Sequence, residues 1–208
     1  MRRIYGWCAI GIIVTLAVGC GPIRRFAYQG FGRDSWQQPD RVIESLALPP
    51  GAQVADLGVG GGYFTWRLAD AVGESGRVYA VDVDSDMISY IEEQSREKGY
   101  ANVQPILAEF DDPLLPEAGV DLIFTCNTYH HLEDREGYFR QAAKSLRAGG
   151  RVAVVEPKGQ GWFQRWLFPH FIEPERVRAE MEAAGYHRVE VFDYLERQSF
   201  QVFEFAGD

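Results

Sequence analysis

The chain has 208 residues, of which 46% are hydrophobic and 25% are charged. This composition is that of a folded domain with a buried core, and it excludes wholesale disorder and fibrous repeats. The formal net charge of −9 makes nucleic acid an unexpected partner, because a chain this acidic repels a phosphate backbone. Three cysteines without paired spacing predict neither a disulfide framework nor a zinc site, and no metal is expected.

The N-terminal residues have the pattern of a targeting segment. Arg2 and Arg3 precede an uncharged apolar stretch from Ile4 to Gly19, which is shorter than the roughly twenty residues of a membrane-spanning helix. Small residues then lead into Cys20, and this resembles a bacterial lipoprotein signal, in which the new N-terminal cysteine is acylated. We therefore expect residues 1–19 to be a signal peptide or an uncleaved anchor, Cys20 to be the lipidation site, and the protein to be attached to a membrane of the bacterial cell envelope, on either side.

The rest of the chain alternates strand-like and helix-like segments with short connections, as in an α/β sheet. The apolar runs VDLIFTC and RVAVVE are typical of strands buried on both sides, hence of a parallel sheet centre. The last two strands are expected to form a hairpin. The expected strands are Gln53–Leu57, Arg77–Val81, Val103–Leu107, Val120–Cys126, Arg151–Glu156, Tyr186–Tyr194 and Ser199–Phe205, and the expected helices are Pro39–Leu46, Tyr63–Val72, one that ends at Lys98, Asp134–Leu146 and Pro174–Ala184.

A glycine-rich turn follows the first expected strand. Gly58, Gly60 and Gly62 lie between this strand and a helix, where glycine lets the backbone approach a ligand closely and the helix start offers unpaired amides. Asp82 comes twenty residues after Gly62, at the end of the second strand. A carboxylate at that position can accept both hydroxyls of a ribose. Together these features predict a site for a nucleotide-like ligand.

Asp56, Gly58, Gly60 and Gly62 form an acid followed by glycines at alternate positions, which resembles the first motif of class I S-adenosylmethionine-dependent methyltransferases. The resemblance implies S-adenosylmethionine as cofactor. It also implies a Rossmann-like, seven-stranded, mostly parallel sheet of order 3-2-1-4-5-7-6, with an antiparallel C-terminal hairpin and helices on both faces, over a domain of residues 39–208. An NAD-dependent oxidoreductase is the weaker alternative, because its fingerprint needs a glycine where Tyr63 stands.

The same resemblance implies roles for further residues around the cofactor. In VYAVDVDSDMI, Asp82 would hold the ribose, Val83 would pack against the adenine and Met87 would lie near it. The loop LAEFDDPLLP resembles the one that places an acid near the adenine amino group. The family's common glycine-aspartate pair is replaced there by Ala108 and Glu109, so Glu109, Asp111 and Asp112 all remain candidates.

The acceptor is expected beyond the fourth strand, since ligands of open α/β sheets lie at the carboxyl ends of strands. Asn127 and His130 are the expected catalytic residues there, and His131 is expected to pack within the fold. Residues 20–38 are expected to form a tether and a possible lid, with Trp36 or Gln37 touching the cofactor. The aromatic stretch of residues 161–171 would cover an apolar acceptor or rest on a membrane.

The resulting hypothesis is a membrane-tethered methyltransferase that acts on a small-molecule or lipid-like acceptor. The main alternative is a catalytically inactive lipoprotein that keeps the methyltransferase fold as a binding module. It arises because S-adenosylmethionine is made in the cytosol, whereas a processed lipoprotein signal would carry the domain across the membrane.

Overall fold

The computed structural model of the chain describes residues 32–159 and 171–207. The expected signal peptide, the lipidation site Cys20, most of the tether and nearly all of the aromatic stretch lie outside these residues. Among the helices that the structure does describe, none is both long enough and apolar enough to cross a bilayer.

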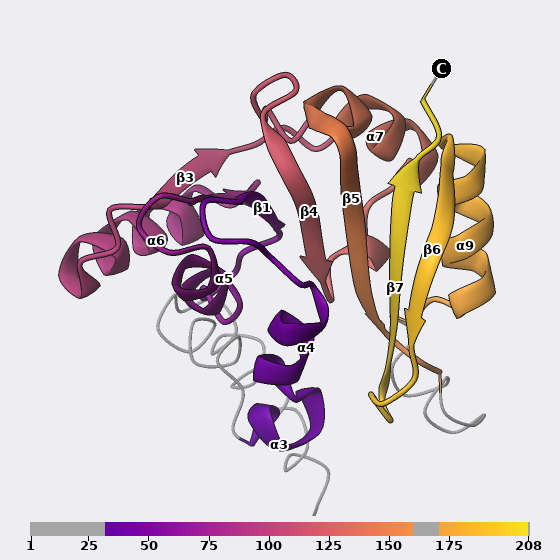
Figure 1. The fold of residues 1–208 in the computed structure, drawn as a ribbon, viewed down its shortest axis with the longest axis horizontal. Coiled ribbons are helices and arrows are strands. Elements are labelled where there is room, and N and C mark those ends of the chain that lie inside the picture. The colour runs from indigo at the N-terminus through magenta and orange to yellow at the C-terminus, as the bar shows by residue number, and fades with distance from the viewer. Residues whose placement is uncertain (1–31, 160–170, 208) are drawn as a thin grey trace, which may run out of the picture.

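One seven-stranded sheet forms the centre of the molecule, in the order β3-β2-β1-β4-β5-β7-β6 (Figure 1). The pairs from β3 to β5 are parallel, whereas β7 runs antiparallel to both β5 and β6. The predicted fold class and strand order are confirmed. The strands are β1 (Gln53–Leu57), β2 (Arg77–Asp82), β3 (Val103–Leu107), β4 (Val120–Cys126), β5 (Leu146–Pro157), β6 (Tyr186–Phe192) and β7 (Gln198–Phe205).

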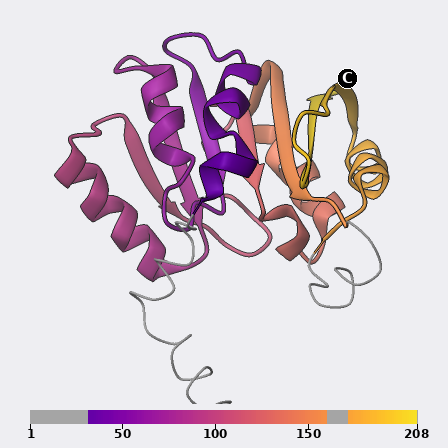
Figure 2. The ribbon, with the colours of Figure 1, turned by 90° about the horizontal axis from the view of Figure 1, so that it is seen from below.

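Helices cover both faces of this sheet, over two separate hydrophobic cores. The helices are α3 (Arg33–Gln37), α4 (Pro39–Ser45), α5 (Thr65–Val72), α6 (Ser85–Lys98), α7 (Arg135–Ala142) and α9 (Pro174–Ala183), with short 3-10 turns η1 (Tyr129–His131) and η2 (Ala143–Ser145). Side chains of α4, α5 and α6 enter one core, and side chains of α7 and α9 enter the other. Figures 1 and 2 agree that α6 and α9 lie at opposite ends of the sheet.

Two predicted boundaries are wrong near the start of β5. The helix expected to reach Leu146 ends at Ala142, and the strand expected from Arg151 begins at Leu146. The chain tightens into η2 after α7, and Leu146 already has extended backbone angles and pairs with Val120. A register shift in the β4–β5 pairing then lets the chain continue into the regular part of the strand.

Both ends of α6 are marked by signals in the local sequence. The Asp84 side chain accepts a hydrogen bond of 2.9 Å from the Asp86 amide, as an N-cap does. Gly99 ends the helix with a left-handed φ of 78°. Each signal lies within a few residues of the helix end that it sets, so the local sequence is enough to mark both ends of α6.

Candidate active site

The glycine turn after β1 is held close to both neighbouring strands. Gly58, Gly60 and Gly62 have φ values of 74°, 48° and 79°, which favour glycine because other side chains are strained there. The Gly58 amide donates to the carbonyl of Val81 in β2 at 2.8 Å. A Cβ atom at Gly58 would lie 2.1 Å from Thr128 Oγ1, just beyond β4. The turn therefore requires glycine for two separate reasons at this position.

Asp82 is fixed beside the turn by two backbone amides. Its Oδ2 accepts from the Gly60 amide at 3.0 Å, and its Oδ1 accepts from the Asp84 amide at 3.0 Å. A carboxylate has about four acceptor positions, so roughly two remain after these bonds. The carboxylate is thus oriented in advance and can still accept two hydroxyl groups.

Asp56 lies buried at the base of the same region. Its Oδ2 accepts a hydrogen bond of 2.7 Å from Thr65 Oγ1 at the start of α5. The pKa of the Asp56 carboxyl is raised to about 6, chiefly by burial and also by the nearby charge of Asp82, against the lowering effects of the Thr65 hydrogen bond and of Arg33. A cationic group brought next to Asp56 would favour its ionised form.

Two cavities open at this end of the sheet, with volumes of about 1050 and 620 Å³. Both are lined by the residues that surround the end of β2 and the start of the loop after β4, which are Gly58, Asp82, Val83, Thr128 and His131. The cavities therefore meet at the oriented carboxylate of Asp82. A ligand with two ends joined by a diol would fit this arrangement.

The larger cavity extends toward the end of β3. Glu109, Asp111 and Asp112 all line it, and the side chains of Glu109 and Asp111 are exposed. The Asp112 carboxylate already accepts hydrogen bonds from the Leu114 amide at 2.8 Å and from Gln141 Nε2 at 3.2 Å. The geometry thus brings the predicted acids Glu109 and Asp111 to the cavity. Thr125 also lines this cavity, and its buried hydroxyl has no hydrogen-bond partner among the residues described. A polar ligand atom in the cavity would give this hydroxyl a hydrogen-bond partner.

The smaller cavity lies between the glycine turn and α3. Arg33 and Trp36 of α3 line it together with Asp56, Met87 and Asn127. Met87 is 2% exposed and Val83 is 43% exposed, so the two side chains predicted near the adenine differ in position. Val83 borders both cavities, whereas Met87 borders only the smaller one.

The two predicted acceptor-facing residues are placed differently. Asn127, with a left-handed φ of 58°, lines the smaller cavity. His130 is not among the residues that line either of these two cavities; its Nδ1 lies 2.6 Å from Oε2 of the buried Glu156. His131, assigned to packing from the sequence, is exposed and lines both cavities.

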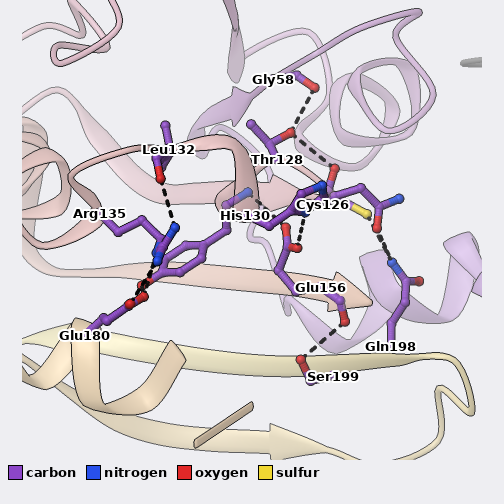
Figure 3. A network of polar contacts seen from close by, with 12 residues as sticks. Gly58, Cys126, Thr128, His130, Leu132, Arg135, Glu156, Glu180, Gln198 and Ser199 are labelled. Carbon is purple, nitrogen blue, oxygen red and sulfur yellow. Dashed lines mark hydrogen bonds and ion pairs between the residues drawn. The ribbon is translucent and has the colours of Figure 1, made fainter. Parts of the chain in front are cut away.

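Glu156 is a site residue that the sequence analysis missed. Its fully buried carboxylate accepts from the Tyr129 amide at 2.9 Å and contacts His130, so it fastens η1 to β5 (Figure 3). The available signal was a single acid at the end of the apolar run RVAVVE, because a charge there needs a buried partner.

The start of the described chain contacts the site through Gln37. This side chain is buried, and its Nε2 donates to Gln198 Oε1 at 2.9 Å and to Cys126 Sγ at 3.0 Å. Burial raises the pKa of the Cys126 thiol to about 12, so it is neutral at physiological pH. Trp36 lines the smaller cavity, whereas Gln37 is not among the residues that line it. No local sequence signal marks Gln198.

The comparison with protein families matches residues 48–206 to a model described as a methyltransferase domain. The chain belongs to this family. The match covers most of the predicted domain and includes the glycine turn, Asp82 and the loop after β4. It confirms the predicted methyltransferase class and decides against the NAD-dependent alternative.

Two curated relatives illustrate the relationship. Aklanonic acid methyltransferase DauC of Streptomyces sp. (strain C5) is 30% identical over 149 residues, which are 71% of this chain and 66% of the relative. A ubiquinone/menaquinone biosynthesis C-methyltransferase, UbiE of Shewanella woodyi, is 30% identical over 116 residues, which are 55% of this chain and 46% of the relative. The chain thus spans less than two thirds of the length of these relatives.

Solved structures share the fold. A SAM-dependent methyltransferase from Aquifex aeolicus superposes with a TM-score of 0.78 at 24% identity, over 88% of this chain and 98% of that one. Coclaurine N-methyltransferase, solved with N-methylheliamine and SAH, has a TM-score of 0.61 at 22% identity, over 75% of this chain and 48% of that one. At these identities the comparison establishes a shared architecture.

Proposed function

We propose that this protein is an S-adenosylmethionine-dependent methyltransferase that acts on a small-molecule or lipid-like acceptor and is tethered to a membrane by its N-terminus. The observation that carries the cofactor part is the bond between the Gly60 amide and Asp82, at the place where the two cavities meet. When bound, the cofactor supplies an electrophilic methyl group on a sulfonium.

The residues of the site fit the parts of this cofactor. Asp82 can accept the two ribose hydroxyls, and Thr125 and the acids Glu109 and Asp111 face the larger cavity, where an adenine and its amino group would find polar partners. The smaller cavity is lined by the carboxyl of Asp56 and by the Arg33 guanidinium. A buried acid and a cation in one cavity match the ammonium and carboxylate of an amino-acid end.

The chain's contribution to the reaction is chiefly to position the reactants and exclude water, because methyl transfer from a sulfonium needs no protein nucleophile. Asn127 lines the cavity at the amino-acid end, and His131 borders both cavities. An acceptor that must lose a proton needs a nearby base, and the pair of His130 and Glu156 is our candidate for that role.

An apolar acceptor is supported by the relatives and by the walls of the smaller cavity. The relatives' names refer to aklanonic acid and to ubiquinone or menaquinone biosynthesis. Trp36, Tyr63 and Phe64 supply aromatic surface to this cavity. A methyl-transfer screen with extracted membrane lipids and small metabolites tests this part. Incorporation of label into either pool supports it, and a cofactor-binding protein that methylates nothing supports the alternative of a silent binding module.

The membrane tether is proposed from the sequence around Cys20. Incorporation of labelled palmitate into the full-length chain, compared with Cys20→Ala, tests lipidation, and protease accessibility in spheroplasts tests the side of the membrane. Label that persists in the Cys20→Ala chain would contradict lipidation at this residue.

Isothermal titration with S-adenosylmethionine and S-adenosylhomocysteine tests the cofactor. We expect binding by the wild type and at least about tenfold weaker binding by Asp82→Ala, because hydrogen bonds to a charged group are lost. The matched control is Asp70→Ala, an exposed acid of α5 that lines neither cavity. Absence of binding by well-folded wild-type protein would falsify the proposal.

A further inference from the structure

A chain of buried amides joins α3 to the loop beyond β4. Arg33 Nε donates to Gln37 Oε1, and Gln37 Nε2 donates to Gln198 Oε1 at 2.9 Å. Gln198 Nε2 in turn donates to Asn127 Oδ1 at 2.8 Å, a contact drawn at Gln198 in Figure 3. Gln37 and Gln198 are 0% and 1% exposed, so water does not compete for these bonds.

Arg33 sets the direction of every hydrogen bond in this series of amides. A guanidinium has donors and no acceptor, whereas each amide has both and can turn either end toward a neighbour. Gln37 must therefore present its oxygen to Arg33, which leaves its nitrogen for Gln198 and the nitrogen of Gln198 for Asn127. The Asn127 oxygen is thereby engaged, and its Nδ2 has no hydrogen bond to any residue that the structure describes.

We propose that Gln198 is a positioning residue, which holds the Asn127 amide so that Nδ2 donates to the carboxylate of the cofactor's amino-acid end. This inference rests on the proposed function. Asn127 lines the smaller cavity together with Arg33 and the acid Asp56. A nitrogen there adds a donor for a carboxylate, whereas an oxygen there would repel it.

The backbone at Asn127 does not depend on Gln198. The Asn127 amide donates to the Val155 carbonyl at 3.0 Å, and the residue keeps its left-handed φ of 58° through the loop itself. Toward this loop, the Gln198 side chain donates only to the side chain of Asn127 and, at 3.8 Å, to the sulfur of Cys126, and its Oε1 accepts from Gln37. Changing Gln198 should therefore alter the direction of one amide and leave the loop in place.

The test compares two ligands that differ at the amino-acid end. Isothermal titration is performed with S-adenosylhomocysteine and with 5′-methylthioadenosine, which lacks the amino-acid group. Gln198→Glu keeps the side-chain volume and removes the donor, so that Asn127 turns its nitrogen toward residue 198 and its oxygen toward the cavity. We expect S-adenosylhomocysteine to bind about tenfold more weakly and methylthioadenosine to bind as it does to the wild type.

Two further variants separate direction from charge. Gln201→Glu is the matched control, since Gln201 is equally buried on the same strand but bonds to the Pro174 carbonyl and to Arg188, neither of which lines a cavity. It should leave both affinities unchanged. Gln198→Met adds no charge and should still weaken S-adenosylhomocysteine selectively, because Asn127 then has no partner to orient it.

Equal affinity of folded Gln198→Glu and wild type for S-adenosylhomocysteine would overturn the inference, and so would an equal loss for both ligands. If Gln198→Glu does not fold, Asn127→Asp takes its place. This variant keeps an acceptor for Gln198, loses the Nδ2 donor and must show the same selective loss. A wild type that binds neither ligand would overturn the proposed function itself, a result distinct from the others.

Discussion

The substitution Gly58→Ala would destabilise the protein for two reasons, a steric clash and a strained backbone, which can be separated by experiment. The added methyl group would lie 2.1 Å from Thr128 Oγ1, and its residue would keep a φ of 74°. Gly99 has a similar φ of 78° with no atom within 4 Å of the added Cβ. We expect Gly99→Ala to lower the free energy of unfolding by about 1 kcal/mol, from the left-handed backbone alone.

Gly58→Ala should cost about 2 kcal/mol more than this control, because the clash forces the loop after β4 to move. It should also weaken S-adenosylhomocysteine binding, whereas Gly99→Ala should not. Urea denaturation and titration measure the two effects. Equal costs at the two glycines would contradict the close approach of the turn to Thr128.

Asp56 makes the stability of the protein depend on pH with a defined sign. Burial raises its pKa from 3.8 to about 6 in the folded state, so the folded chain binds this proton more tightly than the unfolded chain does. The resulting stabilisation is fully present below about pH 4 and is lost as the pH rises through about 6.

Asp56→Asn, which keeps the shape and removes the titration, isolates this contribution. We expect the free energy of unfolding of the wild type, relative to Asp56→Asn, to fall by about 2 kcal/mol between pH 4 and pH 7. Denaturant titrations at several pH values measure it. A difference that stays constant over this range would show that Asp56 is ionised throughout.

At the scale of elements, η1 is held in place by one buried side chain of β5. Glu156 accepts from the Tyr129 amide and contacts His130 Nδ1. Glu156→Leu would leave these buried groups without their partner, and we expect it to cost about 3 kcal/mol of unfolding free energy. Hydrogen exchange at the Tyr129 amide should accelerate. Glu156→Gln keeps an acceptor for that amide and should cost less; an equal cost would contradict this attachment.

The elements also show which parts of the site could be predicted from sequence. Asp56 and Asp82 lie at the carboxyl ends of β1 and β2, and the three glycines directly follow β1, so a local pattern in the sequence predicts this part of the site. Gln198 belongs to no such local pattern, since it lies 71 residues after Asn127. It reaches Asn127 only because β7 inserts beside β5, where Pro157 and Gln198 are paired. The contact of His130 with Glu156 could not be predicted for a similar reason, because the position of Glu156 depends on the register of β5.

At the scale of the whole molecule, the proposed cofactor would contact elements around the four neighbouring strands β3, β2, β1 and β4. The two cavities are lined by residues that follow β1, β2, β3 and β4, and also by α3 and α7. A ligand that binds only when all of these are folded stabilises the entire domain, and the gain grows with the logarithm of its concentration.

S-adenosylhomocysteine at about a hundred times its dissociation constant should therefore add about 2.7 kcal/mol to the stability of the wild type. For a domain of this size that corresponds to a rise of about 5–10 °C in Tm. Asp82→Ala at the same ligand concentration should show a clearly smaller rise, since the carboxylate between the cavities is missing, whereas Asp70→Ala should match the wild type. A full rise in Asp82→Ala would place the ligand elsewhere on the molecule, because binding would then not depend on the carboxylate at which the two cavities meet.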